Sequence, residues 1–133
     1  MENCIFCKIV RGEILNYTVF EDEKVLAFLD ITPCTKGHTV VVLKEHGESL
    51  QEYEEKNLEG LFPAIQKVVR KLEEKLGVKD FTIGMNNGRL AGQLVPHMHV
   101  HIIPRYEGDT GGNIHSIVKK ESDTSVADIA KLL

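Results

Sequence analysis

Apolar residues recur along this chain with two periods, one typical of strands and one typical of a helix. Five short apolar runs, rich in β-branched residues and bounded by turn residues, predict strands at residues 18–21, 25–29, 39–43, 81–85 and about 97–103. The first three runs follow one another closely and predict a meander. We expect Pro104 to end the last strand, because proline cannot donate to the hydrogen-bond ladder.

One long segment has apolar residues three and four positions apart, which is the period of an amphipathic helix. These residues are Leu58, Leu61, Phe62, Ile65, Val69, Leu72 and Leu76. Gly77 follows as a C-terminal cap, whereas Pro63 lies inside the segment. We therefore expect either that the regular helix begins within a turn of Pro63 or that it kinks there. A shorter helix or turn is predicted at residues 5–9.

The predicted elements indicate an α+β fold, in which one long helix packs on one face of an antiparallel sheet of about five strands. The 133 residues match a single domain, with 1–133 as one unit and no linker dividing it. From Tyr106 onward the pattern is weak, and we expect this tail to lie over the surface or over a partner subunit.

Composition narrows the function classes. Hydrophobic residues make up 42% of the chain, yet no segment reaches the roughly 20 apolar residues of a membrane span. The net charge of -4 lacks the basic surplus of proteins that bind nucleic acids. Because the first ten residues hold no secretory signal pattern, we expect a cytoplasmic protein with reduced cysteines.

The row His97, His99 and His101 is the most distinctive feature of the sequence. Side chains alternate between the faces of a strand, so the three imidazoles should line one face. Met98, Val100 and Ile102 should then pack into the core. Three titrating groups crowded on one face have no packing advantage over aliphatic residues, so the row indicates chemistry.

Two kinds of chemistry fit such a row. A metal held by all three imidazoles is disfavoured, because the first and third lie about 13 Å apart along a strand. The other is nucleophilic attack by a neutral imidazole on phosphorus, assisted by a flanking histidine. A polar glycine loop precedes the row and could hold a phosphate with Asn86, Gly88, Gly92 and Gln93.

The remaining cysteines and histidines are less specific when taken singly. Cys4 and Cys7 have metal-ligand spacing but provide only half of a zinc site. Cys34 is most simply a small buried residue. His38 and His46 each stand alone at a strand end, where a structural role is more common.

Residues 92–105 read Gly-Gln-Leu-Val-Pro-His-Met-His-Val-His-Ile-Ile-Pro-Arg, which resembles the signature of the histidine triad (HIT) superfamily of nucleotide hydrolases and transferases. Residues 4–9, 27–31 and 37–41 resemble other blocks of its HINT-like branch. The resemblance spans about residues 3–105 and leaves 106–133 as a variable tail. It implies a HIT fold and a homodimer.

The resemblance also implies roles for individual residues. His99 would be the nucleophile, His101 would contact the phosphate and the bridging atom, and His38 would pair with His101. Asn86 and Gln93 would hold the phosphate, and Asp30 the ribose hydroxyls. The residues implied for the base pocket are Phe6, Ile9, Ile14, Phe28 and Ile31. One structural zinc per chain would be bound by Cys4, Cys7, His46 and His97.

We therefore expect a nucleotide hydrolase or transferase that cleaves a P–N or P–O bond at the α-phosphate of a nucleotide, with a purine base expected. Leu94 stands where phosphoramidase branches carry serine, so a dinucleoside polyphosphate remains an alternative to a phosphoramidate. Another class is a non-catalytic module that binds nucleotide or zinc. A third is a zinc-dependent hydrolase that uses a metal-bound water.

Overall fold

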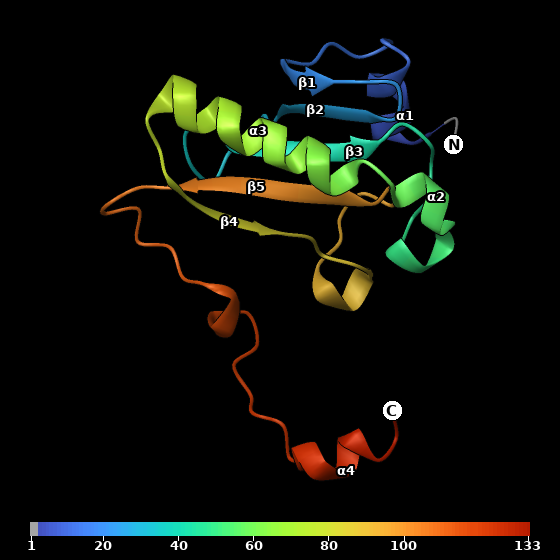
Figure 1. The fold of residues 1–133 in the computed structure, drawn as a ribbon, viewed down its shortest axis with the longest axis vertical. Coiled ribbons are helices and arrows are strands. Elements are labelled where there is room, and N and C mark those ends of the chain that lie inside the picture. Colours follow the sequence, from blue (N-terminus) through green and yellow to red (C-terminus); the bar gives the residue numbers. More distant parts are fainter. Residues whose placement is uncertain (1–2) are drawn as a thin grey trace.

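The computed structural model describes residues 3–133 and contains a five-stranded antiparallel sheet of order β1-β2-β3-β5-β4 (Figure 1). The strands are β1 Thr18–Glu21, β2 Val25–Leu29, β3 Thr39–Leu43, β4 Asp80–Gly84 and β5 His99–Arg105. The helices are α1 Ile5–Val10, α2 Glu55–Leu58, α3 Leu61–Leu76 and α4 Val126–Ala130. None of the helices within residues 3–133 has the length and apolar character needed to span a membrane. The expected α+β fold is confirmed.

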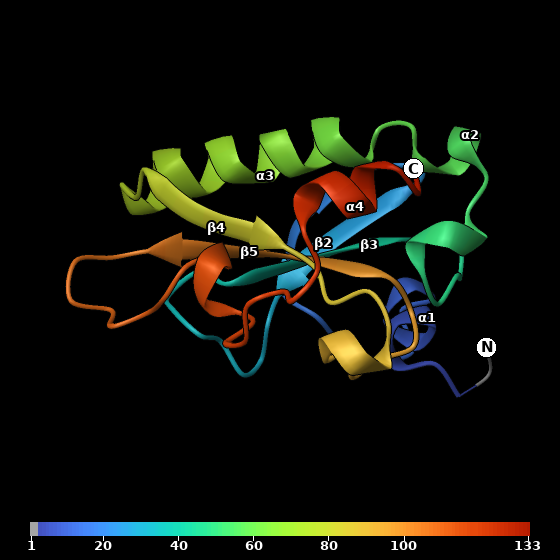
Figure 2. The ribbon, with the colours of Figure 1, turned by 90° about the horizontal axis from the view of Figure 1, so that it is seen from below.

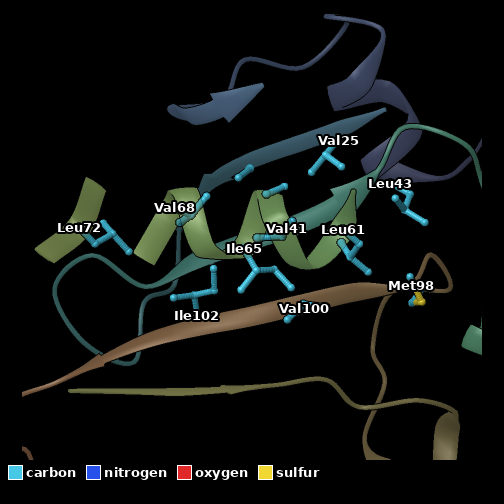
Figure 3. Close-up of a cluster of buried hydrophobic side chains, with 12 residues drawn as sticks. Val25, Val41, Leu43, Leu61, Ile65, Val68, Leu72, Met98, Val100 and Ile102 are labelled. Atoms are coloured by element: carbon cyan, nitrogen blue, oxygen red, sulfur yellow. The ribbon is translucent and has the colours of Figure 1, made fainter. Parts of the chain in front are cut away.

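Helix α3 covers one face of the sheet and closes the larger core. Figure 3 shows its buried side chains packed against those of β2, β3 and β5. The cluster consists of Val25, Ala27, Val41, Leu43, Leu61, Ala64, Ile65, Val68, Leu72, Met98, Val100 and Ile102. The helix ends at Gly77, whose φ of 69° lies in the left-handed region that glycine adopts without strain.

Helix α1 lies on the opposite face of the sheet from α3, as Figure 2 shows. A second cluster forms there from residues of α1, its N-cap and strands β2 and β3. Its buried members are Cys4, Phe6, Cys7, Ile9, Leu26, Phe28, Val40 and Val42. The sheet is therefore covered on both faces, and the buried cysteine and phenylalanine side chains of the described chain lie on the face under α1.

The ends of β5 differ from the expected 97–103. The strand begins two residues later, at His99, and continues through Pro104 to Arg105. Pro104 pairs with Phe81 of β4, but the ladder with β3 ends two residues earlier at the pair Thr39 and Ile102. No β3 residue therefore needs the missing N–H of Pro104. Its carbonyl instead accepts a hydrogen bond from Thr35 Oγ1 at 2.6 Å. The expectation that Pro104 ends the strand was wrong.

The apolar pattern predicted one helical segment from Leu58 to Leu76, whereas the structure divides it into two helices. Helix α2 ends at Leu58, Gly60 adopts a φ of 84°, and α3 begins at Leu61. Pro63 is the third residue of α3, where a missing N–H is harmless because first-turn amides have no partner within the helix. Of the two expectations, the start of a regular helix within a turn of Pro63 is confirmed.

The tail runs away from the sheet, as Figure 1 shows, and residues 110–133 are all exposed. It covers little of its own subunit beyond a hollow that residues 111–117 line together with Cys34, Thr82 and Ile103. Arg105 anchors its beginning through Asp109, with Nε 2.8 Å from Oδ2, and through hydrogen bonds to Thr82 Oγ1 and the Gly112 carbonyl. This pairing holds the pKa of the Asp109 carboxyl well below its usual range.

Candidate active site and metal centre

The three histidines of the row lie on the sheet face covered by α1. The alternation predicted from the sequence is confirmed, because Met98, Val100 and Ile102 belong to the core under α3. His97 and His99 are almost fully buried, with 0% and 7% of their surface exposed. The rings of His99 and His101 lie 5.0 Å apart between centroids.

The main chain orients the ring of His99. Its Nδ1 lies 2.7 Å from the carbonyl oxygen of His97, and since a carbonyl only accepts, Nδ1 carries the proton. In the neutral ring, Nε2 then keeps its lone pair. Phe6 of α1 packs edge-on against this ring, with 5.0 Å between centroids. The ring of His99 is therefore held in one orientation, and these contacts leave the Nε2 lone pair unused.

A chain of hydrogen bonds sets the proton of His101. The amide N–H of Cys34 donates to His38 Nδ1 at 3.0 Å, which leaves the proton of a neutral His38 on Nε2. This N–H donates to His101 Nδ1 at 2.9 Å, so His101 keeps its own proton on Nε2. No sequence pattern pointed to this amide. Cys34 is exposed, so the expectation that it is buried was wrong.

Burial holds these imidazoles in the neutral form. Burial, together with His99 and His38, lowers the pKa of His101 to about 4. Burial also lowers the pKa of His38, and the Asp30 carboxylate opposes that shift only in part. Neutral His101 is thus a hydrogen-bond donor at Nε2, on the ring next to that of His99.

Both Nε2 atoms are open to a ligand. Every buried side-chain nitrogen and oxygen in the described part of the chain has a hydrogen-bond partner. Within residues 3–133, the ring hydrogen bonds of His99 and His101 run through Nδ1. Their Nε2 atoms have no such partner, so they are not among the buried atoms. An incoming phosphate could therefore contact both Nε2 atoms without breaking the bonds that orient the rings.

Asp30 lies next to the His38 and His101 pair. Its Oδ1 accepts hydrogen bonds from Thr32 N at 2.8 Å and Thr32 Oγ1 at 3.1 Å. Its Oδ2 is 3.7 Å from His38 Nε2. The contact with Thr32 fixes the carboxylate at the end of β2 and leaves Oδ2 as the oxygen that could meet a ribose hydroxyl.

The loop before the row is tied together by Gln93. Its Oε1 accepts from Gly88 N at 2.7 Å, and its Nε2 donates to the carbonyls of Glu48 and Val95 at 2.7 and 2.9 Å. Both N–H groups of the amide are thus used, one of them outside the loop at Glu48. The phosphate contact of Gln93 stays a prediction. Asn86 is exposed and lies beside Gly92, and its predicted role is equally open.

Four of the five residues expected in a base pocket come together. Phe6, Ile9 and Phe28 are buried in the cluster under α1, and Ile14 packs against it. The rings of Phe6 and Phe28 meet edge-on at 5.6 Å. Ile31 is 85% exposed in the turn after β2, and the structure does not bring it into this cluster.

Cys4, Cys7, His46 and His97 form a second group beside the row. Their ligand atoms all lie within 4.8 Å of one another. Nδ1 of His97 is 3.5 Å from Cys4 Sγ and 3.6 Å from Cys7 Sγ, and Nδ1 of His46 is 3.3 Å from Cys7 Sγ. A tetrahedral zinc with ordinary bond lengths places sulfur and nitrogen ligands about 3.6 Å apart. The donor set and its spacing fit that ion.

The surroundings of this group fix its members in place. Cys4 is the N-cap of α1, and its Sγ accepts from the amide of Cys7 one turn later at 3.4 Å. His97 Nε2–H donates to the Leu43 carbonyl at 2.8 Å, which leaves the Nδ1 lone pair facing the sulfurs. The rings of His46 and His97 meet edge-on, 5.0 Å apart. These contacts orient ligand atoms before any ion binds.

Comparison with known proteins agrees with this geometry. Residues 11–108 match the family model described as the HIT domain. A HIT family protein from Bacillus subtilis, solved by crystallography, has a TM-score of 0.85 and 41% sequence identity, and the match covers 98% of this chain and 92% of that chain. A zinc-bound histidine triad family protein from Mycobacterium smegmatis has a TM-score of 0.76 and 36% identity, with coverages of 82% and 79%.

A curated relative carries an activity in its name. Adenosine 5'-monophosphoramidase from Schizosaccharomyces pombe is 39% identical over 109 residues, which cover 82% of this chain and 79% of the relative. Residues 11–108, the region that matches the HIT domain model, contain the whole histidine row. With its antiparallel sheet, its three histidines on one face and these relatives, this chain belongs to the HIT family.

Proposed function

We propose that this protein is a nucleotide hydrolase or transferase that cleaves a P–N or P–O bond at the α-phosphate. The proposal rests on one observation above all. The ring of His99 has its lone pair on Nε2 and lies 5.0 Å, between centroids, from the ring of His101, which has its proton on Nε2. Each proton position follows from a hydrogen bond at Nδ1. A nucleophile and a donor to the bridging atom are thus presented by one face of one strand.

In the first step, Nε2 of His99 attacks the α-phosphorus and forms a P–N bond. The bond to the leaving group breaks, and its electron pair moves to the leaving atom. His101 donates a hydrogen bond to that atom and keeps its proton, since a neutral ring has only this proton on Nε2 and Nδ1 is occupied by His38. The leaving atom takes its proton from solvent. Water or another acceptor then attacks phosphorus and frees His99.

The surrounding residues support a nucleoside phosphate as substrate. Asp30 offers Oδ2 to the ribose hydroxyls, and Phe6 and Phe28 offer an apolar surface to a base, for which we propose a purine. The adenosine 5'-monophosphoramidase relative supports a phosphoramidate. Leu94 is 91% exposed and brings no hydroxyl to the leaving group, so a dinucleoside polyphosphate is retained as a second substrate class.

The test is to supply purified protein with adenosine phosphoramidate, diadenosine polyphosphates and nucleotide sugars in parallel. We expect release of a nucleoside monophosphate from at least one of them, and a nucleotidyl adduct on His99 after rapid acid quenching and mass spectrometry. An adduct on another residue, or turnover without any adduct, would contradict the covalent mechanism. Binding of nucleotides without turnover of any substrate would favour the non-catalytic module.

We further propose that Cys4, Cys7, His46 and His97 bind one zinc per chain, as in the zinc-bound relative. A bound zinc joins α1 to the segments before β5 and after β3, so it stabilises the fold. Cys4→Ser and Cys7→Ser should lose about one zinc per chain and melt at lower temperature. Cys34→Ser, which removes an exposed thiol outside the group, is the matched control. A stable wild-type protein without zinc would contradict the proposal.

We also propose that the protein is a homodimer in which the tail packs against the second copy. The tail exposes several large apolar residues that its own subunit does not cover, namely Ile114, Ile117, Val118, Val126, Leu132 and Leu133. Exposed apolar surface of this extent is typical of an interface. Sedimentation equilibrium of the full chain should give twice the mass of 14.9 kDa. A monomer at micromolar concentration would contradict it.

A further inference from the structure

His97 belongs to the metal group and to the catalytic row at once. Its side chain faces the thiols of Cys4 and Cys7 through Nδ1, at 3.5 and 3.6 Å. Its main-chain carbonyl accepts the Nδ1–H of His99 at 2.7 Å. His97 thus links two features. Its side chain belongs to the group that could bind zinc, and its carbonyl oxygen holds the proton of His99 on Nδ1.

We propose that metal occupancy of the Cys4, Cys7, His46 and His97 group holds His99 in its nucleophilic tautomer, with His97 as the positioning residue. The inference deepens the proposed function and rests on it. It assigns to the metal group an effect on the reacting atom, beyond its contribution to the stability of the fold.

Several contacts restrain His97, and of these only a ligand bond at Nδ1 would depend on a metal. Its Nε2–H bonds to the Leu43 carbonyl at 2.8 Å, and its amide bonds to the Val95 carbonyl at 2.8 Å. These two contacts hold one ring atom and the main-chain amide of His97. A ligand bond at Nδ1 would hold a second ring atom. The peptide plane that carries the carbonyl also carries the Met98 N–H, which donates to the Gly47 carbonyl at 2.8 Å, and Gly47 follows His46 of the metal group. A ligand bond at His46 would therefore restrain that plane as well.

Helix α1 supplies a second physical link. Cys4 caps this helix and Cys7 lies one turn further, so the metal group fixes the start of α1. Phe6, between them in sequence, packs edge-on against His97 at 5.9 Å and against His99 at 5.0 Å. A shift of α1 therefore loosens the ring of the nucleophile as well as the carbonyl to which it bonds.

The consequence for His99 is a change of tautomer. While the His97 carbonyl is in place, the proton stays on Nδ1 and the Nε2 lone pair is available. If the carbonyl turns away, a buried Nδ1–H loses its acceptor, and the proton is better placed on Nε2, which reaches solvent. In that tautomer, Nε2 cannot attack phosphorus.

The experiment follows the ring nitrogens of His99 by NMR of protein labelled with 15N-histidine, without any substrate. Zinc is removed by a chelator and returned by titration at constant pH. We expect a single Nδ1–H tautomer of His99 with one zinc per chain, and a mixture of tautomers without it. An unchanged His99 spectrum in folded, zinc-free protein would overturn the proposal, whatever the enzyme assay shows.

Variants at His46 test the effect of the metal without altering a direct neighbour of His99. The ring of His46 contacts Cys7 and His97, and within residues 3–133 it shares no hydrogen bond or ring contact with His99. His46→Ala should lose zinc and show mixed tautomers of His99. His46→Cys keeps four ligands and should restore both zinc and the single tautomer. His115→Ala removes an exposed tail imidazole and is the matched control.

If the zinc-free chain and His46→Ala do not fold, wild-type protein loaded with zinc is compared with wild-type protein loaded with cadmium, a larger ion with longer ligand bonds. The proposal expects the His99 nitrogen signals to differ between the two folded forms, while those of His115 stay the same. Identical His99 signals in both forms would overturn it. A shifted His99 signal in a protein without turnover would support the inference while contradicting the proposed function.

Discussion

The two faces of the sheet have opposite character although the same strand supplies both. Toward α3, β5 and the residue before it contribute Met98, Val100 and Ile102 to an apolar core of twelve residues. Toward α1, the alternate residues His99 and His101 carry ring nitrogens, each oriented by a hydrogen bond. The buried side chains of the first cluster are all apolar, whereas the second face also holds buried imidazoles and thiols.

The difference shows how a small fold can separate stability from chemistry. A period of two lets one backbone serve both faces, so a rigid core is placed one residue away from each reactive ring. Substitution of His99, which faces α1, should therefore change turnover more than folding, and substitution of a core residue on the α3 face should do the reverse. The predictions below test this separation.

The largest effect is expected for His99→Asn on the α1 face. The variant should still bind nucleotide but lose turnover by several orders of magnitude, because no other side chain presents a nucleophile in its place. Single-turnover kinetics and calorimetric binding check the two parts. His115→Asn, in the exposed tail, is the control and should turn over at the wild-type rate. Equal rates for His99→Asn and wild type would remove His99 as nucleophile.

Ile102→Ala tests the opposite face. Ile102 is fully buried against α3, and deletion of such a side chain from a core costs about 2–5 kcal/mol of unfolding free energy. Urea unfolding should show this loss, while kcat at a temperature where the variant is folded should remain near wild type. Ile31→Ala removes the same atoms from an 85% exposed site and is the control for stability. A loss of kcat without a loss of stability would contradict the assignment of stability to the α3 face.

The sequence predicted the sheet face of each residue in the row better than the limits of the strand. Alternation follows from backbone geometry, so the sides taken by His99 and Val100 could be read directly. The extension of β5 through Pro104 depends on where β3 ends, which is a property of the register between two strands distant in sequence. Local pattern carries no information on that register.

The candidate site divides in the same way. Cys4 and Cys7 have a recognisable spacing, and the resemblance to a family completed their group with His46 and His97, which the structure brings together. The main-chain partners were not predictable. The Cys34 amide and the His97 carbonyl set the ring protons of His38 and His99, and every residue type offers such groups.

Asp30→Ala should have an intermediate effect, limited to substrate selection. A carboxylate oxygen left without its hydroxyl partner costs about 1–3 kcal/mol, so the wild type should prefer ribose over deoxyribose nucleotides. The variant should bind ribonucleotides more weakly and show a smaller preference, measured as the ratio of the two kcat/KM values. Because Thr32 bonds to Oδ1, Thr32→Val should weaken this preference less than Asp30→Ala. Equal losses for both sugars would assign Asp30 a structural role.

The smallest effect is the dependence of stability on pH through His101. Burial and the neighbouring His99 and His38 lower its pKa to about 4 in the folded state, against the opposing effect of Asp30, whereas an exposed imidazole titrates near 6.5. Between these values the unfolded chain binds more protons, so the free energy of unfolding falls as pH decreases from about 6.5 to about 4. One such group contributes at most about 1.4 kcal/mol per pH unit. Urea unfolding between pH 7 and 4.5 should therefore give a shallower slope for His101→Gln than for wild type or His115→Gln, and equal slopes in all three would show that His101 titrates normally in the folded protein.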